Sequence, residues 1–122
     1  MVQLKGKAEL AKTAEPLAGK SYIVTKTEEV KTAVQGFNGL RVTFDPTEAK
    51  EKATLKEEGK TCCTMLWMRE TAGIRSKLGS FLDAFTTFLG DEDKALNSDN
   101  WINHTIRLIS WKEKVREITV IK

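Results

Sequence analysis

Histidine and cysteine are scarce in this chain of 122 residues. His104 is the only histidine, and the two cysteines, Cys62 and Cys63, are adjacent. Neighbouring residues on a strand point to opposite faces, so this pair cannot share a metal ion, and a disulfide between vicinal cysteines closes a strained ring. We interpret both as small, reduced packing residues.

The common enzyme and cofactor motifs are missing as well. A single histidine leaves no zinc ligand set, and no nucleophile motif accompanies it. The sequence contains neither a P-loop nor a G-x-G-x-x-G stretch. We therefore expect a protein that is not an enzyme and that uses no metal and no cofactor.

Long apolar runs and a strong net charge are also lacking. No stretch approaches the ~18 apolar residues of a membrane span, and the first residues lack the apolar centre of a signal peptide. We therefore expect a cytoplasmic protein with no membrane partner. The net charge of +3 is too small to indicate a nucleic-acid partner by itself, so that inference depends on where the charges lie.

What the chain does have is the length and apolar content of one domain with a modest core, because 40% of its residues are hydrophobic. Residues 1–18 are weakly patterned and predict a partly ordered lead-in, so the domain is expected to span 19–122. Residues 45–59 carry charges of both signs with little apolar content and predict a solvated loop with at most a helical turn.

β-Branched or alternating segments predict five strands, at 22–32, 40–44, 60–69, 101–111 and 115–121. Gly36, Asn38 and Gly39 indicate a hairpin between the first two.

A helix is predicted between the third and fourth strands. Its apolar residues recur at helical spacing and form one stripe. Thr71 or Ser76 can cap its start, and Gly90 follows its end. We interpret the stripe as core packing rather than a ligand groove; it consists of Ile74, Leu78, Phe81, Leu82, Phe85, Phe88 and Leu89.

The order of three strands, a helix and two strands is that of the OB-fold, a five-stranded Greek-key barrel whose helix plugs one end. The main alternative is an open five-stranded sheet with one helix on it. An α/β fold is disfavoured because helices do not alternate with strands.

Three short segments carry a family resemblance that covers roughly residues 17–121. The segment "TMLWMRETAG" resembles strand three of archaeal and phage single-stranded-DNA-binding OB-folds, and "WINHTIRLISW" is similar to their strand four. The segment "LAGKSYIVTKTEEV" resembles their entry into the first hairpin. Two positions depart from the pattern: Asn103 stands where a glycine is usual, and Lys114, Val115 and Arg116 replace a further aromatic residue.

The resemblance implies that Trp67 and Trp111 stack on bases. Every base has a π-face, so an exposed tryptophan can hold a base without reading its identity, while neighbouring cations contact the phosphates. If Leu66 faces the barrel, strand alternation directs Trp67 outward, and it places Trp111 on the exposed face of its own strand. The predicted nucleic-acid-binding residues are Arg41, Trp67, Arg69, Arg107, Trp111, Lys112, Lys114 and Arg116.

The charges are distributed in the same sense. Residues 105–122 hold five Lys or Arg against two Glu, whereas residues 91–104 hold four Asp or Glu against one Lys. A groove for a single strand would have this asymmetry. We therefore expect a protein that binds single-stranded DNA, or alternatively RNA, with little sequence preference, as in replication or repair.

Several alternatives stay open at this point. Trp67 is a core residue if the strand register is reversed, and Trp101 is expected in the core or as a cap below the barrel. The basic stretch near Trp111 can also be a solvated edge hairpin, since edge lysines oppose aggregation. The whole domain can instead be a protein-interaction subunit or adaptor that uses the barrel surface, or a small barrel enzyme or ligand carrier.

Overall fold

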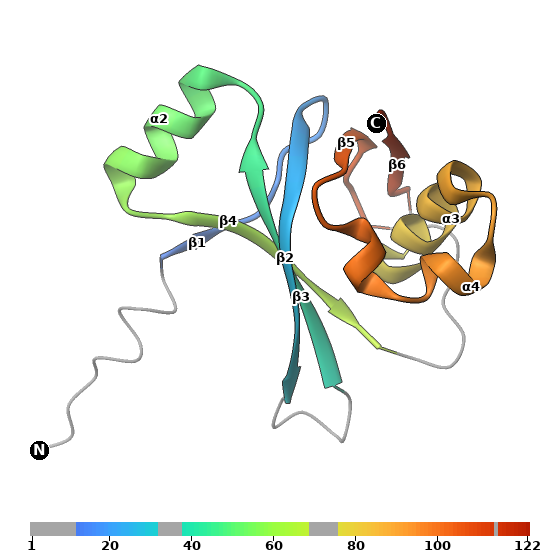
Figure 1. Cartoon of the computed structure of the whole chain (residues 1–122). Coiled ribbons are helices and arrows are strands. Elements are labelled where there is room, and N and C mark those ends of the chain that lie inside the picture. The colour runs from blue at the N-terminus through green and yellow to red at the C-terminus, as the bar shows by residue number, and fades with distance from the viewer. Residues whose placement is uncertain (1–11, 32–37, 69–75, 114) are drawn as a thin grey trace, which may run out of the picture.

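One six-stranded sheet and a few short helices make up the computed structural model, which describes residues 12–31, 38–68, 76–113 and 115–122 (Figure 1). The strands are β1 (Thr13–Ala14), β2 (Ser21–Lys31), β3 (Asn38–Pro46), β4 (Thr61–Trp67), β5 (Thr105–Ser110) and β6 (Glu117–Val120). The helices are α2 (Ala49–Glu58), α3 (Lys77–Leu89), α4 (Glu92–Ala95) and the 3₁₀ turn η1 (Ser98–Trp101). Within these ranges, every helix is too short or too polar to cross a membrane.

The five predicted strands and the helix between the third and fourth of them are confirmed. The sheet has the order β1-β4-β3-β2-β5-β6. Strands β2, β3 and β4 pair antiparallel in succession, and β5 returns to pair with β2. This is the order of a Greek key. The expected antiparallel pairing of the first two strands is present, but Asn38 and Gly39, expected in its turn, already belong to β3, and Gly36 lies in residues 32–37, outside the described ranges.

The predicted closed five-stranded barrel is wrong, because the sheet is open. Closure would need β4 to pair with β6, and no such pairing exists in the part of the chain that the structure describes. The start of the β4 edge is instead taken by β1, which runs parallel to it with Thr13 opposite Thr61 and Ala14 opposite Cys62. The sixth strand thus comes from the segment expected to be a lead-in.

The solvated loop predicted for residues 45–59 is also wrong. Its first two residues complete β3, and most of the remainder forms α2. Lysine, glutamate, alanine and leucine favour a helix intrinsically, and Gly59 ends it in the left-handed conformation at φ 66°. No residue of α2 is buried, and only Leu55 packs against the core. The segment therefore lacks the apolar stripe that announces most helices in a sequence.

The core lies between the inner face of the sheet and helix α3. Alternate residues of β3 and β4 are buried, and they form one core cluster with Phe81 and Phe85 of α3. Both phenylalanine rings stack on Trp101 at centroid distances of 5.3 Å. Trp101 is 2% exposed, and its Nε1 donates to the carbonyl of Ala95 at 2.8 Å. The core interpretation of Trp101 is therefore confirmed.

Two capping residues set the ends of α3, and an asparagine with positive φ precedes β5. The Ser76 side chain accepts from the Gly79 amide at 3.0 Å, and Gly90 ends the helix at φ 73°, as predicted. The other proposed cap, Thr71, and the first stripe residue, Ile74, lie outside the described ranges. Asn103 adopts φ 71° just before β5, so it takes the left-handed conformation for which a glycine is usual.

Candidate nucleic-acid interface

Trp67 ends strand β4 on the outer face of the sheet. Its side chain is 42% exposed, whereas the preceding Leu66 is fully buried. The predicted alternation of β4 is therefore confirmed, and the reversed register is wrong. On the neighbouring strand Trp67 lies opposite Gly39.

Gly39 has no side chain, and the side chain of Met65 fills the space beside the indole of Trp67. A Cβ atom at this position would collide with Sδ of Met65, so the thioether of Met65 lies over the glycine. Met65 has the same orientation as Trp67, two residues along the strand. Together, Trp67, Met65 and Gly39 form an apolar surface, which we call the outer-face patch.

Arg41 borders this patch on β3, half-exposed and opposite Met65. One of its guanidinium nitrogens lies 3.3 Å from Oε1 of Glu28 on β2, and Nζ of Lys26 lies 3.7 Å from the other oxygen of Glu28. Arg41 points outward as predicted, but its charge is already paired. Because exposed pairs of this kind contribute at most ~1 kcal/mol, a phosphate can compete with Glu28 for Arg41.

Trp111 does not lie on the exposed face of Arg107 and Ile109, and that prediction is wrong. The pairing of β5 with β6 shifts between Leu108 and Ser110, so Ile109 is an extra residue that forms a bulge. Beyond the bulge the alternation is reversed. Arg107 and Ile109 stay exposed, while Trp111 is half-buried and packs against the core.

Three contacts hold the indole of Trp111 in place. Its ring meets Phe81 edge-on at a centroid distance of 6.2 Å, and the guanidinium carbon of Arg116 lies 5.5 Å from its centroid. Its Nε1 donates to Oε2 of Glu15 at 3.4 Å. Arg116 thus covers part of the π-surface that a base would need. The arrangement indicates a structural role for Trp111 and Arg116.

Glu15 is a contributor that the sequence analysis missed. Its Oε2 also accepts from the hydroxyl of Thr64 on β4 at 2.9 Å, and its Oε1 lies 3.3 Å from Nζ of Lys77 on α3. One carboxylate therefore joins the segment after β1 to β4, α3 and Trp111. No local pattern announces it, since its partners are 49 to 96 residues away in the sequence.

Arg107 and Lys112 are exposed, and within the described ranges neither of them forms an ion pair. We call these two residues and Arg116 the turn patch, because Lys112 and Arg116 lie in the turn between β5 and β6 and Arg107 is exposed on β5, the strand that leads into it. Arg69 and Lys114, also predicted, lie outside the described residues. Trp67 lies on the outer face of the sheet, whereas Trp111 packs against Phe81 and the core, so the single predicted surface divides into two patches.

The two cysteines lie on opposite faces of β4, as predicted. Cys62 is buried, and burial, followed by the nearby charge of Glu51, raises the pKa of its thiol to about 12. Cys63 is half-buried, and burial also raises its pKa. Both are therefore neutral thiols near pH 7. The described part of the chain holds no group of three His, Cys, Asp or Glu side chains that could bind a metal ion.

Comparison of the chain with protein-family models, with curated proteins and with solved structures found no match.

Proposed function

We propose that this domain is an open variant of the OB-fold that binds single-stranded nucleic acid. OB-folds bind oligonucleotides on the face of their second and third strands and on the loop between the fourth and fifth. By chain order these correspond here to β3 and β4 and to the turn between β5 and β6. The outer-face patch and the turn patch occupy these two places. The Greek-key order and the position of α3 support the proposal.

The exposed indole of Trp67 is the observation that carries it. A large aromatic side chain gains nothing from exposure to water, and its neighbours Gly39 and Met65 add apolar surface beside it. A base can stack there without being identified, which contributes ~1–3 kcal/mol. Trp111 has a different role in this proposal, since it anchors the turn that presents the cations.

The phosphates would be held mainly by Arg107 and Lys112. Both are exposed and free of ion pairs within the described ranges, so they need not give up a partner. Arg41 can hold a further phosphate once its guanidinium has released the carboxylate of Glu28. With few cations available, the affinity is expected to be modest and to depend on salt. Nothing in this arrangement selects DNA over RNA.

The test is the affinity of a labelled single-stranded oligonucleotide for Trp67→Ala, followed by fluorescence anisotropy. We expect a loss of ~1–3 kcal/mol, because the stacked base loses its platform. The tryptophan emission of the wild type should also be quenched on binding, and Trp67→Phe should abolish most of that change, since Trp101 is buried and Trp111 half-buried.

Phe88→Ala is the matched control, because Phe88 has the same 42% exposure but lies on α3. It should bind as the wild type does. Equal losses in the two variants, or no binding by the wild type at low salt, would contradict the proposal.

A further inference from the structure

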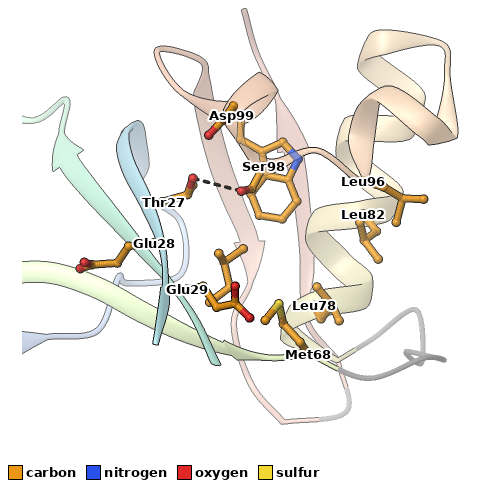
Figure 2. Close-up of a pocket in the computed structure, with 11 residues that line it drawn as sticks. Thr27, Glu28, Glu29, Met68, Leu78, Leu82, Leu96, Ser98 and Asp99 are labelled. Atoms are coloured by element: carbon orange, nitrogen blue, oxygen red, sulfur yellow. Dashed lines mark hydrogen bonds between the residues drawn. The ribbon is translucent and has the colours of Figure 1, made fainter. Parts of the chain in front are cut away.

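A pocket of about 460 Å³ opens beside the sheet and helix α3 (Figure 2), and no residue of the outer-face patch lines it. Its lining comes from β2, β3 and the end of β4 on one side, and from α3, Leu96 after α4 and the turn η1 on the other. Its apolar lining consists of Leu40, Met68, Leu78, Leu82, Leu96 and Trp101. This volume falls within the range of sites that bind small molecules or side chains, ~300–1,000 Å³.

The mouth of the pocket combines an exposed leucine with a closed polar end. Leu96 is 60% exposed, and Figure 2 shows it beside Leu82 of α3. At the other end Thr27 donates to the hydroxyl of Ser98 at 3.1 Å, which joins β2 to η1. Leu96 thus continues the apolar lining of the pocket outward to the surface.

The charge of the rim selects the kind of occupant. Glu29 and Asp99 line the pocket, and among the residues that the structure describes no lysine or arginine does so. Glu28 also lines it, but its side chain turns away (Figure 2) and pairs with Arg41. Asp99 belongs to the connector 91–104, which holds four acidic residues and one lysine. Phosphates are repelled from such a rim, whereas lysine and arginine are attracted.

We propose that this pocket binds a short segment of another protein, which inserts an apolar side chain between Leu82 and Leu96 and places lysine or arginine against Glu29 and Asp99. The apolar lining provides the burial, and the acidic rim provides the selection for cations. The pocket would thus give the domain a protein-binding surface that is separate from both patches. The inference does not depend on nucleic-acid binding.

The test measures binding of fluorescein-labelled peptides to the full chain by anisotropy at low salt. The first peptide carries a leucine pair flanked by lysines, the second replaces the lysines with glutamate, and the third replaces the leucines with serine. We expect the first to bind and the other two to bind at least about tenfold more weakly, since each lacks one of the two features.

Two kinds of variant locate the site. The double change Glu29→Lys and Asp99→Lys should weaken the first peptide by about tenfold or more. Leu96→Ala should weaken it by about fivefold, because it removes apolar area at the mouth without disturbing the core. The double change Glu57→Lys and Asp83→Lys alters the net charge equally at exposed positions outside the pocket, and it should leave binding unchanged.

Three outcomes would overturn the proposal. The first is no binding of the lysine peptide at low salt. The second is an equal loss in the rim variant and its charge-matched control, which would reduce the effect to net charge. The third is self-association of the protein, seen by sedimentation and abolished by Leu96→Ala, since a second copy would then be the occupant.

Discussion

At the scale of single residues, strand alternation is the most informative property of this chain. It predicts that Cys62 and Cys63 diverge and that Leu66 and Trp67 do so as well, and both predictions are confirmed. The reason is local, because successive side chains of any strand point to opposite faces. The contacts of Glu15 could not be predicted, since they depend on which segments the fold brings together.

Because Cys62 is buried, the free energy of unfolding is expected to fall at alkaline pH. The pKa of its thiol is raised from 9.0 to about 12, so the folded state keeps a proton that the unfolded chain loses. The contribution is fully present below about pH 9 and disappears as the pH rises towards 12, with a slope approaching ~1.4 kcal/mol per pH unit. Urea unfolding at about pH 8 and about pH 10 measures this loss.

Cys62→Ser is the control, because serine has no group that titrates in this range. The variant should lose clearly less unfolding free energy between the two pH values than the wild type. Equal losses would mean that Cys62 does not keep its proton in the folded state. Tyr22, whose pKa is also raised by burial, contributes a further loss at higher pH in both proteins.

At the scale of elements, the success of prediction follows the strength of the apolar pattern. Helix α3 has an apolar stripe, a serine at its start and a glycine after its end, and its bounds are close to those predicted. Helix α2 buries none of its residues, so hydrophobic periodicity had nothing to detect. The bulge at Ile109 could not be predicted from the sequence, because a residue is extra only with respect to its pairing partner, here β6.

The bulge turns Trp111 towards the core, and we therefore expect Trp111→Ala to destabilise the protein. Its indole contacts Phe81, Arg116 and Glu15, but it is only half-buried. The loss should be about 2–3 kcal/mol, below the ~3–5 kcal/mol of fully buried aromatic side chains. Urea unfolding gives this quantity, and Trp67→Ala is the control that should cost less than about 1 kcal/mol.

A loss in Trp111→Ala as small as that in Trp67→Ala would contradict this assignment. Trp111 would then be an exposed side chain, as strand alternation without a bulge implies. The two variants thus separate a tryptophan that supports the fold from one that is available to a ligand.

At the scale of the whole molecule, the strand order was predictable and the closure of the sheet was not. The order follows from five strong strand patterns and the place of one helix. Closure depends on which segment reaches the edge of β4, and the two residues of β1 carry no strand pattern that would predict their pairing there. The division of the predicted site into two patches is likewise a property of the assembled fold.

Salt dependence of single-strand binding tests the central claim most directly, because it separates stacking on one patch from charge on the other. If two to three phosphates are contacted, the logarithm of the affinity should fall with the logarithm of the salt concentration at a slope of roughly −2, taking ~0.7 per contact. Arg107→Ala combined with Lys112→Ala should flatten that slope by about one unit, whereas Trp67→Ala should lower the affinity and leave the slope unchanged. Equal affinity for duplex and single strands would contradict the account. So would a salt slope that the Arg107 and Lys112 variant leaves unchanged, combined with an affinity that Trp67→Ala leaves unchanged.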